Sequence, residues 1–131
     1  MKFLLDTQIL LWSIFGTRHL TPRVRQVLED DASELFVSVV SIWELAIKVG
    51  IGKLNLPGSS TRYVLEQLED IGAVILPIEP AHILRLEMLP RFPHHKDPWD
   101  RMLIAQAIEE KLTILSADSK FPLYNVSLIW K

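Results

Sequence analysis

Four acidic residues stand at points where the predicted secondary structure brings carboxylates together. Asp6 directly follows the first apolar run of the chain, and Asp118 closely follows a late one. Glu44 and Asp100 are each expected in the first turn of a helix that starts at the same edge of the sheet. Ionised carboxylates that converge at ~5 Å repel one another by roughly 3 kcal/mol per pair at an effective dielectric constant of ~20. Such a cluster needs a counter-charge.

A bound divalent ion is the counter-charge that the sequence favours. No arginine stands next to Asp6 or Glu44 along the chain. An all-oxygen donor set suits hard Mg²⁺, or Mn²⁺ as an alternative, better than zinc. Such an ion activates water and stabilises the charge that develops on a phosphodiester. The acidic constellation therefore predicts phosphodiester hydrolysis.

Glu44 and a fifth acid, Asp97, also have a purely structural interpretation. Asp and Glu are favoured near helix N-termini as caps and for their interaction with the helix dipole. Ser41 and Glu44 have capping-box spacing, and Glu44 could pair with Lys48 one turn later, so a structural and a functional role are equally supported there. Asp97 fits an N-cap, which we favour over a catalytic role.

Asp100 is more informative because of its place on a helix. Leu103, Ile104 and Ala107 follow it at intervals of three, four and seven residues, which puts its carboxylate at the head of the apolar stripe. An unpaired carboxylate is costly to bury, so this position predicts a partner, whether a cation, a hydrogen-bond donor or a metal.

The elements that position these acids alternate between strands and helices. Apolar runs predict strands at residues 3–5, 35–40, 73–76, 113–115 and 126–130. Helical spacing or capping signals predict helices at residues 9–15, from 22, at 41–49, near 63–68, after 80 and from 98 to 111. Parallel neighbours need helical crossovers, so the pattern predicts an α/β fold, a three-layer α/β/α sandwich with a mostly parallel central sheet.

Composition sets the class of protein. With 131 residues, of which 49% are hydrophobic, residues 1–131 are expected to form a single domain. The net charge of −2 gives no general attraction to polyanions, so a local patch must bind any nucleic acid. There is no cysteine, and Asp6 and Gln8 interrupt the apolar start, so we expect a cytoplasmic protein without a signal peptide. The sequence contains no run of 18 apolar residues, so a membrane span is not expected.

A local basic patch is available around the last two acidic positions. Its members are Arg91, His94, His95, Lys96, Arg101 and Lys120. The prolines of the loop predict an exposed, irregular segment, and this rim could hold RNA phosphates or be only a solvated loop. His94 and His95 as transition-metal ligands are disfavoured because no third histidine is close in sequence. The tryptophans fit core or interface positions better than base stacking, with Trp99 as the best exception.

Four segments together resemble those of the PIN-domain nucleases, and in particular the VapC-like toxins. They are residues 4–8 (Leu-Leu-Asp-Thr-Gln), 41–45 (Ser-Ile-Trp-Glu-Leu), 95–107, with the two acids Asp97 and Asp100, and 115–118 (Leu-Ser-Ala-Asp). The resemblance spans nearly the whole chain. Each segment is unspecific alone, but the four occur in the family's order.

The resemblance implies which residues act. Carried over by position, the catalytic and metal-binding acids are Asp6, Glu44, Asp100 and Asp118, with Ser116 as a polar helper. Thr7 would assist near the first acid, although Gln8 replaces the asparagine that often follows. Asp97 gives the third motif a second candidate acid, which could contribute as a metal ligand through a bound water.

The resemblance also implies an activity and partners. It predicts a Mg²⁺-dependent endoribonuclease that hydrolyses RNA, acts as a toxin, forms a homodimer and is inhibited by a cognate antitoxin. Two rivals stay open. An aspartyl-phosphate phosphatase with Asp6 as nucleophile would need a second acid where Gln8 stands. A catalytically inactive PIN-like protein-binding module would be expected to lose one or more of the four acids.

Overall fold

A parallel five-stranded sheet forms the centre of the protein. The computed structural model describes residues 1–131, and the strands lie in the order β3-β2-β1-β4-β5. They are β1 (Lys2–Leu5), β2 (Glu34–Ser38), β3 (Ala73–Leu76), β4 (Thr113–Leu115) and β5 (Leu128–Ile129). All four pairings are parallel, with Leu5 beside Val37 of β2 and Leu115 of β4. The predicted parallel sheet is confirmed.

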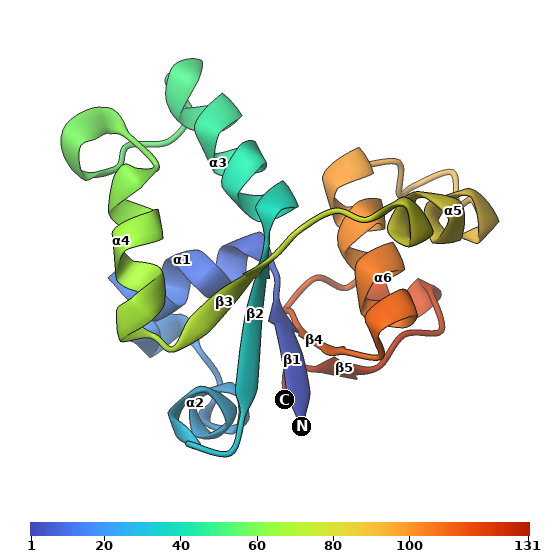
Figure 1. Ribbon diagram of the computed structural model, residues 1–131, viewed down its shortest axis with the longest axis horizontal. Helices are drawn as coiled ribbons and strands as arrows, with labels where there is room; N and C mark the ends of the chain where they lie inside the picture. The colour runs from blue at the N-terminus through green and yellow to red at the C-terminus, as the bar shows by residue number, and fades with distance from the viewer.

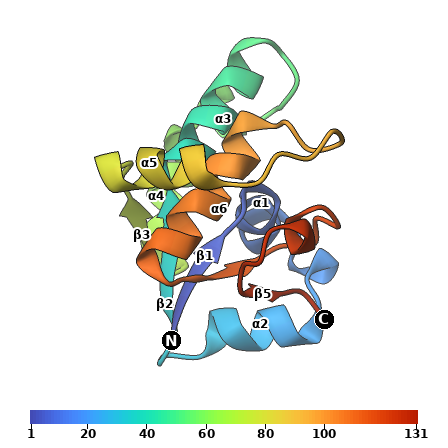
Figure 2. The same ribbon diagram turned by 90° about the vertical axis from the view of Figure 1, so that its right-hand side faces the viewer.

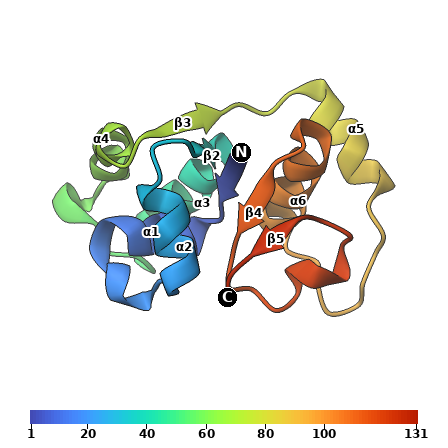
Figure 3. The same ribbon diagram turned by 90° about the horizontal axis from the view of Figure 1, so that it is seen from below.

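Helices cover both faces of this sheet (Figure 1). They are α1 (Thr7–Phe15), α2 (Pro22–Glu29), α3 (Val39–Gly50), α4 (Arg62–Asp70), α5 (Pro80–Met88) and α6 (Pro98–Glu110), with short 3₁₀ turns at Thr17–His19, Pro57–Ser59 and Phe121–Leu123. Helices α1, α2 and α4 lie on one side of the sheet and α5 and α6 on the other, as the view from below also shows (Figure 3). The fold is thus the predicted three-layer α/β/α sandwich.

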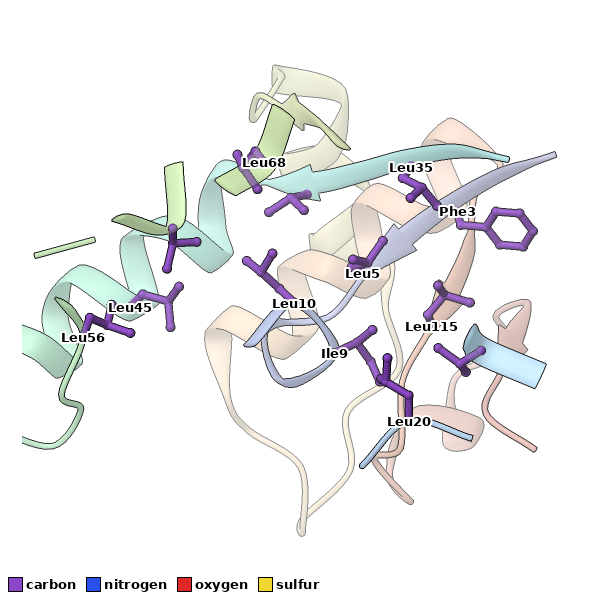
Figure 4. Packing of buried hydrophobic residues seen from close by; sticks show 13 residues of the cluster. Phe3, Leu5, Ile9, Leu10, Leu20, Leu35, Leu45, Leu56, Leu68 and Leu115 are labelled. Carbon is purple, nitrogen blue, oxygen red and sulfur yellow. The ribbon is translucent and has the colours of Figure 1, made fainter. Parts of the chain in front are cut away.

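Two apolar clusters fill the spaces between the layers. Alternate residues of β1 point to opposite faces, so Phe3 and Leu5 belong to one cluster and Leu4 to the other. The first cluster also takes in Ile9 and Leu10 of α1, and Figure 4 shows these two gathered beside Leu5. The second cluster lies under α6, along which α5 packs (Figure 2). Burial on both faces explains why the strands read as continuous apolar runs.

The ends of several elements follow capping chemistry. Thr21 caps α2 by accepting a hydrogen bond from Val24 N, and Pro22 takes the first helical position, as predicted. The predicted strand at residues 35–40 is too long, because Ser38 accepts from Val40 N and starts α3 at Val39. The last strand is also shorter than predicted, since only Leu128–Ile129 pair with β4. None of the helices has the length and apolar character needed to cross a membrane.

Candidate active site

The strand order reverses between β1 and β4, and the candidate site lies at this point. From β1 the chain continues to β2 and β3 on one side, and β4 and β5 are added on the other. Open parallel α/β sheets bind ligands at such a switch point, outside the carboxyl ends of the strands. A cleft of about 440 Å³ opens here. It is lined by Asp6, Thr7, Gln8, Leu11, Glu44, Leu45, Lys48, Lys53, Leu54, Asp100, Ala117 and Asp118.

Asp6 is held at the carboxyl end of β1 by backbone pairing and by its role as a helix cap. Its N–H donates to the carbonyl of Leu115 on β4 at 3.1 Å, and its Oδ1 accepts from Ile9 N at 2.7 Å, capping α1. The residue is only 7% exposed. Burial raises the pKa of Asp6 to about 6, and repulsion from Asp100 and Asp118 adds to the rise, while hydrogen bonds from Ser116 and Ile9 oppose it.

Glu44 lies in the second turn of α3 rather than in the first, which corrects the expected capping box with Ser41. The helix begins five residues before it, and Ser38 provides the cap. The Glu44 carboxylate is buried, and both of its oxygens have partners. Thr7 donates to Oε1 at 2.8 Å, and Lys48 donates to Oε2 at 2.6 Å, which confirms the predicted one-turn pair. The side-chain partner of Thr7 among the acids is therefore Glu44, and its expected role near Asp6 stays a prediction.

Asp97 and Asp100 have different surroundings at the start of α6. Asp97 Oδ1 accepts from the N–H groups of Trp99 and Asp100 at 2.9 and 3.1 Å, so Asp97 is the predicted N-cap and Pro98 the first helical residue. Asp97 does not line the cleft, whereas Asp100 does. Burial raises the pKa of Asp100 to about 6, with a further contribution from the Asp97 charge, and the hydrogen bond with His95 opposes this rise.

Asp118 is placed by a tight turn after β4. The hydroxyl of Ser116, a buried residue, accepts a hydrogen bond from Asp118 N at 3.0 Å. Asp118 Oδ1 then accepts from Lys120 N at 2.8 Å. The Ser116 side chain also lowers the pKa of Asp6, so it acts on both acids that follow the central strands. The structure thus brings Asp6, Glu44, Asp100 and Asp118 to one cleft.

His95 corrects the expectation of a fully exposed basic loop. It is only 3% exposed, although Arg91, His94 and Lys96 around it are exposed as expected. One nitrogen of His95 and one carboxylate oxygen each of Asp100 and Asp118 all lie within 4.8 Å of one another. Sequence reasoning missed this placement because the prolines indicated an open loop and no periodicity singled out His95.

Cationic side chains are distributed over two neighbouring hollows. Lys48 and Lys53 line the acidic cleft, and Lys53 was not predicted as a site residue. A second hollow of about 430 Å³ is lined by Arg91, Phe92, Pro93, His95, Lys96 and Arg101. His95 therefore borders the basic hollow while it contacts Asp100 of the acidic one.

The tryptophans next to the acids do not line the acidic cleft. Trp43 and Trp99 pack edge to face, with ring centroids 6.1 Å apart and an interplanar angle of 89°. This contact joins α3 to α6. It favours the packing interpretation of Trp99 over base stacking.

The donor set fits a hard divalent cation. Asp6 and Asp100 both have raised pKa values, and in each case Asp118 contributes repulsion. Lys48 is already paired with Glu44, so it does not neutralise the other three acids by direct contact. A divalent cation held by carboxylate oxygens would offset both the burial and the repulsion. The cleft thus has the donor set that a divalent cation requires.

An acidic cleft at the switch point of a parallel sheet places the chain in a broad class of α/β proteins that bind ligands at the carboxyl edge. Comparison with known families is more specific, since the PIN domain model matches residues 3–126. The chain belongs to the PIN domain family.

Individual relatives agree with this assignment. Ribonuclease VapC16 of Mycobacterium tuberculosis is 33% identical over 58 residues, which are 44% of this chain and 41% of that protein. The match therefore spans about two fifths of the curated relative.

Solved structures share the fold over the whole chain. VapBC2 from Rickettsia felis, solved with a DNA fragment from its promoter, aligns with a TM-score of 0.72 at 16% identity and covers 100% of both chains. VapBC-1 from nontypeable Haemophilus influenzae has a TM-score of 0.70 at 17% identity and covers 98% of this chain and 97% of its own. FitAcB from Neisseria gonorrhoeae has a TM-score of 0.63 at 22% identity and covers 97% of this chain and 96% of its own.

Proposed function

We propose that this chain is a metal-dependent endoribonuclease that hydrolyses RNA phosphodiester bonds and acts as the toxin of a toxin–antitoxin pair. The observation that carries the proposal is the convergence of Asp6, Asp100 and Asp118 in one cleft, where none of them is paired with a lysine or an arginine. A carboxylate cluster that needs a cation is suited to phosphodiester chemistry. Membership of the PIN domain family and the ribonuclease name of the M. tuberculosis relative support the same activity.

The metal site that we propose consists of the acids at the switch point. Asp6, Asp100 and Asp118 would hold Mg²⁺, or Mn²⁺ as an alternative, and Glu44 would complete the acidic set from α3. When bound, the ion supplies an activated water and offsets the negative charge that develops on the phosphodiester. Thr7 would orient Glu44 through its hydrogen bond, and Ser116 would serve as the polar helper that lowers the pKa of Asp6. For Asp97 the cap is the role with contacts to support it, and its part as a metal ligand stays a prediction of the sequence.

The RNA backbone would be held by the cationic side chains around the cleft. Lys53 lines the acidic cleft itself, and Arg91 and Lys96 line the neighbouring hollow. Such residues bind phosphates of any sequence and set the register of the strand. This local patch compensates for the net charge of −2 of the whole chain.

The partners that we propose are a cognate antitoxin and a second copy of the chain. The VapBC and Fit structures that share the fold support an antitoxin partner. Exposed apolar side chains on β3 and α5 offer a surface for association: Val74, Ile75, Ile83, Leu84 and Met88. We further propose that residues 1–131 form one domain and that the protein acts in the cytoplasm, where its RNA substrate is found.

Cleavage of a mixed cellular RNA pool by the purified chain tests the proposal. We expect cuts with Mg²⁺ or Mn²⁺ that disappear with EDTA and in Asp100→Asn. Asp31→Asn, an exposed substitution outside the cleft, serves as the matched control and should cut like the wild type. Absence of cleavage by folded, antitoxin-free protein at high concentration would overturn the nuclease proposal in favour of a binding module. Phosphatase turnover without RNA cleavage would favour the aspartyl-phosphate chemistry instead.

A further inference from the structure

The imidazole of His95 belongs to a hydrogen-bonded chain that ends at Asp100. Its Nδ1 lies 2.7 Å from the hydroxyl oxygen of Tyr124, and its Nε2 lies 3.3 Å from Asp100 Oδ2. Arg101 Nη1 donates to the same Tyr124 oxygen at 3.1 Å and to the carbonyl of Pro90 at 2.9 Å. These contacts join the loop before α6, its first turn and the segment after Phe121–Leu123.

This series of hydrogen bonds has a defined direction from donor to acceptor, because the proton of the Tyr124 hydroxyl has only one available acceptor. Tyr124 is 1% exposed, and a buried hydroxyl must donate to a hydrogen-bond partner. A guanidinium is a donor without acceptor atoms, so Arg101 cannot take this proton. Nδ1 of His95 is the remaining partner, and it must accept. The ring therefore carries its hydrogen on Nε2, which can only donate toward Asp100.

We propose that His95 is a positioning residue, fixed in the Nε2–H tautomer by Tyr124 and Arg101, that holds Asp100 in place for the metal. This inference rests on the proposed function in one respect, the assignment of Asp100 as a metal ligand. Donation from His95 occupies Oδ2 of Asp100 and leaves Oδ1 for a cation. Outer partners of this kind orient metal ligands and strengthen the binding of the ion.

The arrangement also answers an electrostatic need of Asp100. A carboxylate that binds a metal ion must be ionised. A hydrogen bond donated to the carboxylate favours its ionised form. His95 is the side chain that supplies this bond, from a ring that is itself almost fully buried.

Direct metal ligation is the competing role for His95, because its ring nitrogen is grouped with oxygens of Asp100 and Asp118 within 4.8 Å. Ligation through Nε2 would require that nitrogen to be unprotonated, which moves the hydrogen to Nδ1. Nδ1 would then have to donate to Tyr124, whose own proton would be left without an acceptor. The two roles therefore predict opposite tautomers.

Nitrogen-15 NMR of the full chain labelled at histidine distinguishes these roles. The four histidines can be assigned by substitution, and His95→Gln removes the signal of interest. We expect the His95 ring to carry its proton on Nε2 both without metal and after addition of Mg²⁺, which is diamagnetic. A proton on Nδ1, in either state, would overturn the proposal.

Mg²⁺ affinity, measured by calorimetry, provides the second test. We expect His95→Ala to weaken Mg²⁺ binding about 10- to 100-fold, the range found for outer partners of metal ligands. His95→Gln should recover most of the affinity because its amide has an acceptor for Tyr124 and a donor for Asp100, as the imidazole does. His94→Gln, a change at the exposed neighbour, is the matched control and should bind like the wild type.

Tyr124→Phe removes the hydrogen-bond partner of His95 that lies on the side away from Asp100, and it leaves Asp100 itself unchanged. Loss of the hydroxyl should let both tautomers of His95 appear in the spectrum, an effect that lost packing alone would not produce. Equal Mg²⁺ affinity in His95→Ala and the wild type would overturn the positioning role. If Mg²⁺ binding and the tautomer behave as expected but no RNA is cut, the nuclease proposal fails and the positioning role stands.

Discussion

Lys48 Nζ donates to Glu44 Oε2 at 2.6 Å, so the one acid of the cleft that comes from α3 has its own cation. The lysine is partly exposed, whereas the glutamate is almost buried. The pair distinguishes Glu44 from the other acids of the cleft, none of which is paired with a lysine or an arginine. It also makes Lys48 a residue whose charge opposes the arrival of a metal ion in the same cleft.

Substitution of Lys48 should therefore affect stability and metal binding in opposite directions. We expect Lys48→Met to lower the free energy of unfolding of the metal-free protein by about 1 kcal/mol, because an i,i+4 partner of a buried carboxylate is lost. The same variant should bind Mg²⁺ a few-fold more tightly. Chemical denaturation and calorimetry measure the two effects, with Lys111→Met, at the far end of α6, as the control. Weaker Mg²⁺ binding in Lys48→Met would contradict this account of the cleft.

The raised pKa of Asp6 predicts that the metal-free protein loses stability as the pH rises. Its ordinary value of 3.8 applies to the unfolded chain, and the folded value is about 6. Below pH 3.8 the carboxyl group of Asp6 is protonated in both the folded and the unfolded state. Between pH 3.8 and about 6 it is protonated only in the folded state. The stabilisation present at low pH is therefore lost as the pH rises through about 6. This difference corresponds to about 3 kcal/mol for the single group.

Asp6→Asn is the variant that isolates this effect. An asparagine retains the side-chain oxygen that accepts from Ile9 N, and it carries no charge. We expect the free energy of unfolding to rise by about 1 to 3 kcal/mol at pH 8 and to stay near the wild-type value at pH 4. Urea denaturation in EDTA across this range provides the measurement. An equal gain at both pH values would mean that charge is not the cause.

Most of the fold could be predicted because its elements have local signals. Burial of both sheet faces makes the strands apolar without interruption, and Pro22, Pro80 and Pro98 each begin a helix. The boundary between β2 and α3 was missed for a physical reason. Val39 and Val40 favour strands by their β-branched side chains, but the cap from Ser38 commits them to the helix.

The acids of the site and the one-turn pair of Glu44 with Lys48 could be predicted, but the partners that come from distant parts of the sequence could not. An Asp directly after a buried strand reaches the carboxyl edge of the sheet whatever the rest of the chain does. His95 is buried by contacts such as that with Tyr124, which is 29 residues later, and no local pattern reports such a contact. Lys53 lies in the loop after α3, and no local sequence pattern indicates that it lines the cleft.

The cap at Asp97 allows its structural role to be tested apart from metal binding. We expect Asp97→Ala to lower the free energy of unfolding by about 1 kcal/mol, since two N–H groups of α6 lose their acceptor. Asp97→Ser should restore most of that stability because serine is also a good cap. If Asp97 acts only as the cap, Mg²⁺ affinity and the free energy of unfolding should change together across these variants. The serine variant, with its cap restored, should then bind Mg²⁺ nearly as the wild type does. A serine variant that is stable but binds Mg²⁺ ten-fold more weakly would make Asp97 part of the metal site.

Addition of Mg²⁺ should stabilise the folded protein, because the unfolded chain does not hold the acids together. At a concentration 100-fold above its dissociation constant, an ion that binds only the folded state adds about 2.7 kcal/mol. The resulting rise in Tm, measured by calorimetric scanning at pH 7.5 or a similar pH, should be several degrees and should be reversed by EDTA. Asp100→Asn should gain less stability from Mg²⁺ than the wild type does. Its Tm without metal should be higher than that of the wild type, because the neutral amide removes the cost of burying the charge of Asp100. A variant that gains the full Mg²⁺ shift would show that the ion binds away from Asp100, and the acidic cleft would then need another ligand.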